Sequence, residues 1–174
     1  MDTKNKPLII GITGPFGSGK STAANFFIEK GFTRVTLSSF LEKDLKKRNV
    51  GITRKNLQDL GNEWREKFGY QILAEKSLDL ILKQGIKKAV IDGIRNVGEI
   101  KYLRKNANFI LIGIVADRKI RFERVKKLKD REVLDPDLFE ELDYRDLGIE
   151  GTEKNGLQVA KCLAIADYFI DTNE

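Results

Sequence analysis

The residues with the clearest chemical potential lie in the glycine-rich stretch GITGPFGSGKST, which runs from Gly11 to Thr22 after the apolar residues Leu8–Ile10. From Gly14 onward its spacing is G-x-x-x-x-G-K-S. In such a loop the glycines let backbone N–H groups converge on phosphate oxygens, aided by the N-terminus of the following helix. A glycine-rich packing turn is the alternative. The strand-like run before the pattern and the helix-like run after it favour a phosphate-binding loop.

Two side chains of this loop have a specific expected role. Lys20 would contact the β- and γ-phosphates of a nucleotide, and the Ser21 hydroxyl would bind Mg²⁺. The expected nucleotide-binding residues of the loop are Gly14, Phe16, Gly17, Ser18, Gly19, Lys20, Ser21 and Thr22.

A carboxylate suited to the same metal ends another strand-like run. The residues Ala89–Asp92 are apolar up to Asp92. An acid at the tip of a strand beside a phosphate-binding loop can hold Mg²⁺ or one of its waters. The alternative is that Asp92 caps a helix and that Arg95, close behind it, is a surface charge.

The segment TRKNLQDLGNEWREKFG shows helical periodicity with an unusual third face. At 100° per residue, one stripe is apolar and comprises Leu57, Leu60, Trp64 and Phe68. The neighbouring stripe holds Arg54, Gln58 and Arg65. Two arginines and an amide beside an apolar edge suit the rim of a pocket, where guanidinium groups bind a monophosphate and Gln58 contacts a base edge. A solvated polar face is the alternative.

A basic run crosses residues 118–131, in which only Glu123 and Asp130 are acidic. Its cations are Arg118, Lys119, Arg121, Arg124, Lys126, Lys127, Lys129 and Arg131. The run can serve a polyphosphate or form an ordinary solvated face.

Composition narrows the class of protein. The chain has 174 residues, 41% of them hydrophobic and 33% charged, which suits one globular domain. Its net charge of +6 is spread along the chain, so we infer no extended nucleic-acid surface. The sequence contains no histidine and one cysteine, which excludes a histidine base and an internal disulfide.

No apolar run approaches the length of a membrane span, and the polar start MDTKNKP lacks a secretory signal, so we expect a cytoplasmic protein.

Strand-like runs alternate with helical segments along the whole chain. The runs are Leu8–Thr13, Thr33–Leu37, Ala89–Asp92, Phe109–Val115 and Tyr168–Asp171. This alternation predicts an α/β fold with a parallel sheet covered on both faces. Two helical excursions, at about 38–84 and 117–166, are longer than a simple crossover requires.

With these elements placed, the chain resembles the P-loop kinases of small substrates, particularly nucleoside monophosphate kinases and dephospho-coenzyme A kinase. Within that superfamily it looks most like the deoxynucleoside monophosphate kinase-like proteins. The resemblance covers nearly the whole chain and is carried by GITGPFGSGKST, LQDLGNEWREKFG, VIDGIRNVGE, VADRKIRFERV and CLAIADYFIDTN. It implies a single domain over residues 1–174, a three-layer sandwich with strand order 2-3-1-4-5, an acceptor-binding insert at about 38–84 and a lid at about 117–137.

The resemblance also implies roles for individual residues. Acceptor-binding residues of similar kinases lie on the first insert, which supports Arg54 and Arg65. The sequence DGIR resembles the Asp-Gly-x-Pro-Arg element of adenylate kinases, where the aspartate serves the metal and the arginine the acceptor phosphate. Here the proline is missing and Arg95 comes one residue earlier. Arg121 and Arg124 match the R-x-x-R pair of the lid, where Arg124 would stack on adenine or approach the phosphates.

The second strand ends differently from that of related kinases, in which an aspartate often follows it. This chain has Ser38 and Ser39 instead, and we expect Ser39 to contact the acceptor. An acceptor phosphate is already a nucleophile, whereas a hydroxyl acceptor benefits from a base. The missing aspartate therefore favours a monophosphate acceptor.

The expected activity is transfer of the γ-phosphoryl group from ATP to a nucleoside or deoxynucleoside monophosphate. The expected catalytic residues are Lys20, Asp92, Arg121 and Arg124, and the expected metal ligands are Ser21 and Asp92. Two alternatives stay open: a hydroxyl kinase similar to dephospho-coenzyme A kinase, and a P-loop nucleotide-binding protein without transferase activity. The sequence leaves the acceptor's identity and the oligomeric state undetermined.

Overall fold

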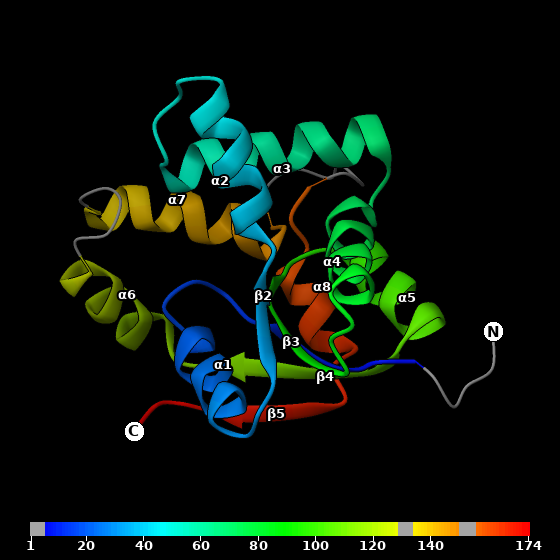
Figure 1. Cartoon of the computed structure of the whole chain (residues 1–174). Coiled ribbons are helices and arrows are strands. Elements are labelled where there is room, and N and C mark those ends of the chain that lie inside the picture. The colour runs from blue at the N-terminus through cyan, green and yellow to red at the C-terminus, as the bar shows by residue number, and fades with distance from the viewer. Residues whose placement is uncertain (1–5, 129–133, 150–155) are drawn as a thin grey trace.

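In the computed structural model, which describes residues 6–128, 134–149 and 156–174, a five-stranded sheet forms the centre of the chain (Figure 1). The strands lie in the order β2-β3-β1-β4-β5, and these neighbours pair in parallel. The predicted α/β class and strand order are therefore confirmed. The strands are β1 (Leu8–Thr13), β2 (Thr33–Thr36), β3 (Lys88–Ile94), β4 (Asn108–Val115) and β5 (Tyr168–Asp171).

Helices fill the connections between the strands. Both expected excursions divide into three helices within the described residues. The helices are α1 (Lys20–Glu29), α2 (Ser38–Lys47), α3 (Arg54–Phe68), α4 (Ile72–Lys83), α5 (Val97–Asn106), α6 (Arg118–Lys127), α7 (Pro136–Leu147) and α8 (Val159–Ala164). Among the residues that the structure describes, no helix is long and apolar enough to cross a bilayer.

Local chemistry explains where α3 begins and ends. The chain leaves α2 through Asn49, which has a left-handed φ of 55°. The Thr53 hydroxyl then caps α3 by accepting a hydrogen bond of 3.1 Å from the N–H of Asn56. Gly69, with φ at 98°, ends the helix. Phe68, the last residue of the apolar stripe, is 49% exposed, because it lies at the helix end, where it packs edge-on against Trp64.

The two faces of the sheet carry separate cores because successive strand residues point in opposite directions. Ile9 and Leu111 belong to the larger core, which also takes buried residues from α2, α3, α4, α5 and α8. Ile10 and Val90 pack on the other face against Ala24 of α1. Apolar side chains on both faces are what a parallel sheet covered on two sides requires.

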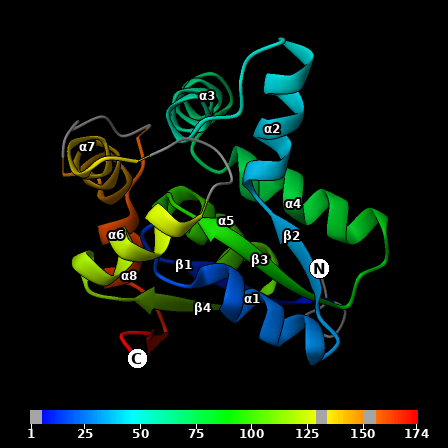
Figure 2. The same cartoon turned by 90° about the vertical axis from the view of Figure 1, so that its left-hand side faces the viewer.

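The two excursions meet above one edge of the sheet. Figures 1 and 2 show α3 and α7 side by side there, and two contacts tie them together. The Gln58 side-chain amide donates to the carbonyl oxygen of Leu142 at 3.3 Å, and Arg145 forms an ion pair with Asp59. Part of the expected lid, residues 129–133, lies outside the described residues.

Candidate functional site

The glycine-rich loop connects β1 to α1, as expected. Gly14 has a φ of 147° and Gly17 a φ of 80°, a conformation that side chains rarely adopt. A Cβ at Gly14 would lie 2.3 Å from the carbonyl oxygen of Ile114, and one at Gly17 would lie 2.7 Å from that of Arg121. Both glycines are therefore needed for the loop to fit between its neighbours. The first turn of α1 has neither a side-chain cap nor an acidic residue, which leaves its N-terminus suited to an anion.

Lys20 opens α1, and its ammonium group donates to the Pro15 carbonyl oxygen of the same loop at 2.8 Å. Burial, and after it the nearby positive charge of Arg95, lowers the pKa of Lys20 to about 8. A phosphate oxygen beside this amine would oppose both effects by stabilising its charged form.

Asp92 lies near the end of β3, in register with Ile12 of β1 and Thr36 of β2. It is 5% exposed, and it caps no helix, because α5 begins with Asn96 as its N-cap. The side chain of Asp92 forms an ion pair with Arg34, a β2 residue that the sequence reasoning missed. An arginine inside a strand of a parallel sheet covered on both faces was the available signal, because such a charge needs a partner.

Asp92 and Ser21 share one cationic neighbour. The same Nη2 atom of Arg34 that contacts the Asp92 carboxylate also donates to the Ser21 hydroxyl at 3.3 Å. The two expected metal ligands thus lie close enough to bind one positive group between them. Their oxygen donors are of the kind that Mg²⁺ prefers, so this pair fits the expected metal.

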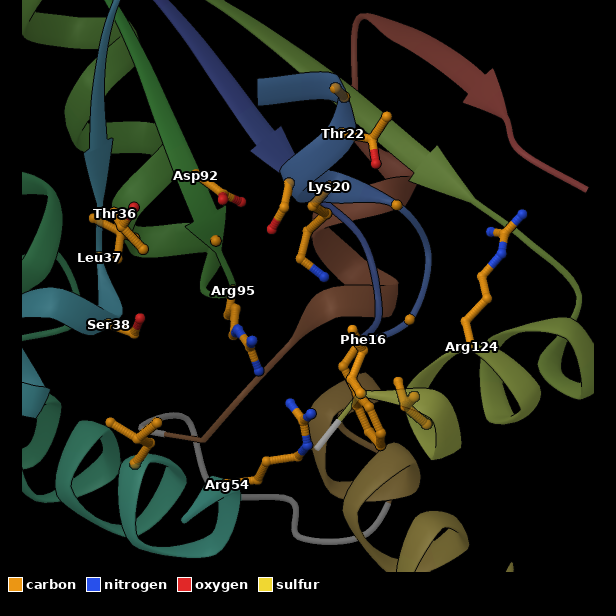
Figure 3. A pocket seen from close by; sticks show the side chains of 18 of the residues that line it. Phe16, Lys20, Thr22, Thr36, Leu37, Ser38, Arg54, Asp92, Arg95 and Arg124 are labelled. Atoms are coloured by element: carbon orange, nitrogen blue, oxygen red, sulfur yellow. The ribbon is translucent and has the colours of Figure 1, made fainter. Parts of the chain in front are cut away.

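A cavity of about 1010 Å³ joins this region to the first insert. Figure 3 shows Arg54 and Arg95 extending into the space beside Phe16 and Lys20, with Arg124 on the other side of the loop. The sequence-predicted residues that line the cavity are Phe16, Gly17, Gly19, Lys20, Ser21, Thr22, Arg54, Gln58, Arg65, Asp92, Arg95 and Arg124.

Four predicted residues do not line this cavity: Gly14, Ser18, Ser39 and Arg121. Gly14 and Ser18 are buried parts of the loop itself. The Ser39 hydroxyl donates to the carbonyl oxygen of Thr36 at 2.7 Å, which binds it to its own chain segment.

The polar stripe of α3 faces the cavity, and its members differ in how they are bound. Gln58 is 4% exposed, and its Oε1 atom has no hydrogen-bond partner while its amide nitrogen donates to α7. Arg65 forms a buried ion pair with Glu99 at 3.0 Å. The Arg54 guanidinium lies 5.3 Å from the centre of the Phe16 ring, which links α3 to the glycine-rich loop.

The cavity also contains an acid that the sequence reasoning missed. Glu42 lines it, and Ser38, which lines it as well, donates to the Glu42 carboxylate at 3.1 Å. Asp44, the next acid along α2, is instead bound by Arg48 at 2.9 Å and by the Trp64 ring nitrogen at 3.1 Å. The spacing Ser38-x-x-x-Glu42 at a helix start was the available signal, since it places both side chains on one face.

The arginines of α6 are bound by other parts of the chain. Arg121 is 4% exposed and forms two hydrogen bonds with the Asp143 carboxylate, at 2.5 and 2.9 Å. It also donates to the Phe16 carbonyl oxygen at 3.3 Å. Arg124 donates to Thr172, whose hydroxyl in turn donates to the Ser18 carbonyl oxygen at 2.9 Å. Helix α6 and the C-terminal segment therefore both hold the glycine-rich loop.

The fold and the loop together define a class of protein, a domain with the fold of P-loop kinases. Shikimate kinase from Acinetobacter baumannii shares the fold with a TM-score of 0.55 and 18% identity, over 97% of this chain and 85% of that one. A gluconokinase from Sinorhizobium meliloti shares it with a TM-score of 0.53 and 11% identity, over 98% of this chain and 85% of that one. At these identities the likeness shows the fold alone.

The chain belongs to the UPF0200 family, whose name assigns no activity. The UPF0200 protein of Methanocaldococcus jannaschii is 30% identical over 167 residues, which are 94% of this chain and 80% of the relative. That of Sulfurisphaera tokodaii is 32% identical over 163 residues, 93% of this chain and 85% of the relative. A UPF0200/UPF0201 protein of Archaeoglobus fulgidus is 32% identical, and this chain spans 50% of its length. No family model matches the sequence.

Proposed function

We propose that the protein is an ATP-dependent kinase that transfers the γ-phosphoryl group to a nucleoside or deoxynucleoside monophosphate. One observation carries the proposal: a single cavity is lined by both the glycine-rich loop and the arginine-bearing face of α3. A protein that only binds ATP has no use for a second anion site beside the first. A transferase needs two, because donor and acceptor must lie together.

On the donor side, the loop from Gly14 to Thr22 holds the phosphates of ATP through its backbone N–H groups and the N-terminus of α1. Lys20 gives up its bond to Pro15 and regains its full charge against the β- and γ-phosphates. Ser21 and Asp92 would hold Mg²⁺, which when bound neutralises phosphate charge.

On the acceptor side, Arg54, Arg65 and Arg95 supply positive charge for the monophosphate. The Arg65 guanidinium is fixed by Glu99 and that of Arg95 by Asp146 at 2.5 Å, so both are oriented before the acceptor arrives. The unpartnered Gln58 Oε1 accepts a hydrogen bond from an N–H or O–H group of the acceptor. An acceptor phosphate oxygen then attacks the γ-phosphorus, the bond to the β–γ bridging oxygen breaks, and ADP leaves.

A second candidate is a hydroxyl kinase, similar to dephospho-coenzyme A kinase, and the Ser38–Glu42 pair favours it. Glu42 would take the proton of an acceptor hydroxyl as that oxygen attacks the γ-phosphorus. A P-loop nucleotide-binding protein without transferase activity is the third possibility.

An acceptor screen with ATP and Mg²⁺ separates these three functions. The panel contains nucleoside and deoxynucleoside monophosphates, dephospho-coenzyme A, shikimate and gluconate, and ³¹P NMR identifies the bond formed. The proposal expects a new phosphoanhydride signal with a monophosphate. A new phosphate monoester would establish the hydroxyl kinase instead. ATP binding without transfer to any member would contradict both kinase assignments.

A further inference from the structure

Arg34 occupies an unusual place for a residue with no role in the proposed transfer. It extends from β2 and lines the cavity, and the Nη2 atom of its guanidinium contacts both Asp92 and Ser21. Its Nη1 atom donates to the Asn25 side chain at 3.3 Å. A positive group of the protein thus lies between the two side chains proposed to hold Mg²⁺.

The pairing of Arg34 is weaker in geometry than a second arginine–carboxylate pair beside the same loop. Arg121 donates two parallel hydrogen bonds to the Asp143 carboxylate, and both side chains are almost fully buried, at 5% and 0% exposure. Arg34 contacts Asp92 through Nη2 alone, with 28% of its own side chain exposed. Its buried Nε donor has no partner at all. A single-point pair with an unsatisfied donor is easier to separate than a two-point pair.

We propose that Arg34 is a built-in cation that competes with Mg²⁺ for Asp92 and Ser21, and that it thereby sets how strongly nucleotide binding depends on the metal. The inference rests on the proposed function for the ligand, a nucleotide whose phosphates lie on the glycine-rich loop. Arg34 is a positioning residue in this account, because it acts through Asp92.

The competition follows from charge. A guanidinium and Mg²⁺ repel each other at contact distance, so the metal binds Asp92 only after Arg34 has left it. Without metal, Arg34 neutralises a carboxylate that would otherwise repel the phosphates of ATP. The same residue therefore hinders nucleotide binding when Mg²⁺ is present and supports it when Mg²⁺ is absent.

Arg34→Gln tests this sign reversal by calorimetric titration with a non-hydrolysable ATP analogue, in excess Mg²⁺ and in EDTA. We expect the variant to bind about tenfold more tightly than wild type with Mg²⁺ and about tenfold more weakly in EDTA. A role limited to holding the fold would weaken binding under both conditions. Equal changes in the two buffers, or none in either, would overturn the inference.

Matched variants isolate the mechanism. Arg104→Gln removes an arginine paired with Asp167 outside the cavity, and we expect it to change neither affinity. In an Asp92→Asn background, Arg34→Gln should no longer tighten binding with Mg²⁺, because the contested carboxylate is gone. Should Arg34→Gln fail to fold by circular dichroism, Arg34→Met, which also removes the charge, replaces it and should shift both affinities in the same two directions.

The titration also separates this inference from the proposed function. Sign reversal without phosphoryl transfer in the acceptor screen would refute the kinase assignment and leave the role of Arg34 standing. Nucleotide binding without the reversal would refute only the role of Arg34. A wild-type protein that binds no nucleotide in either buffer would refute both.

Discussion

Helices α3 and α6 both carry arginines beside the glycine-rich loop, yet they offer those charges differently. On α3, Arg54 and Arg65 line the cavity, and Gln58 presents an unpartnered oxygen. On α6, Arg121 is bound by a buried carboxylate of α7, and Arg124 is bound by Thr172. Through Gln58 the first helix keeps hydrogen-bonding capacity for a ligand, whereas the second uses Arg121 and Arg124 to hold the loop in place.

Both helices have an arginine paired with a buried carboxylate, Arg65 with Glu99 and Arg121 with Asp143, and the difference lies in what else each helix contacts. Both carboxylate oxygens of Asp143 accept hydrogen bonds from Arg121, and Arg118 also contacts this carboxylate at 3.3 Å. A dense run of cations in a sequence therefore does not reveal whether those cations reach a ligand. The buried acids of a neighbouring element decide that.

The largest expected effect is on α6. Arg121→Ala should lower the free energy of unfolding by about 3–5 kcal/mol, because Asp143 would stay buried without its main partner. Urea denaturation measures the change, and the double variant Arg121→Ala/Asp143→Ala should recover most of it. Unchanged stability combined with a large loss of turnover would make Arg121 a lid arginine and break the comparison.

Lys20→Ala, unlike Arg121→Ala, should lower turnover without lowering stability. Turnover should fall by about 10²–10³-fold, since a preorganised charge at the transferring phosphoryl group is lost. The free energy of unfolding should not fall, because the removed ammonium group is buried and its pKa is lowered. A loss of stability as large as that of Arg121→Ala would show that Lys20 mainly supports the fold.

The lowered pKa of Lys20 also predicts a pH dependence of stability without ligand. The unfolded chain keeps this proton up to about pH 10.5, whereas the folded protein releases it near pH 8. Between these values the unfolded state binds more protons, so the free energy of unfolding rises with pH. Relative to Lys20→Met, wild type should gain on the order of 2 kcal/mol from pH 7.5 to pH 10. A constant difference between the two proteins would contradict the burial of the charged amine.

Gln58→Leu gives the smallest expected effect. It tests whether α3 offers a hydrogen-bond acceptor to the ligand, which is the α3 side of the comparison with α6. The affinity for the acceptor should fall about tenfold, the equivalent of one hydrogen bond, with little change for ATP. Stability should change by less than about 1 kcal/mol, because the substitution removes an unsatisfied oxygen along with one bond to Leu142. Steady-state kinetics with both substrates tests it, and an equal loss of affinity for ATP and for the acceptor would contradict the role of Gln58.

The sequence pattern predicted the parallel sheet, the family resemblance supplied its strand order, and most of the predicted site residues line the cavity. Strong local patterns explain this success: the glycine spacing before Lys20 and the 100° projection of α3 each depend on residues close together in the chain. The role of Arg34 was missed because its partners come from α1 and β3. These elements are distant in the chain, so the residues around Arg34 do not indicate which side chains it contacts. The surroundings of Arg121 and Glu42 could not be predicted for the same reason. The partner of Arg121 comes from α7, and the position of Glu42 beside the cavity depends on how distant elements pack.

The account stands on two separate anion sites within one cavity. Its most direct test is the melting temperature of the protein saturated with a non-hydrolysable ATP analogue and Mg²⁺, measured while nucleoside and deoxynucleoside monophosphates are added. The account predicts a further rise with at least one monophosphate, and loss of that rise in Arg54→Ala. A monophosphate that instead displaces the ATP analogue, with no additional rise for any member of the panel, would show a single site and contradict the account.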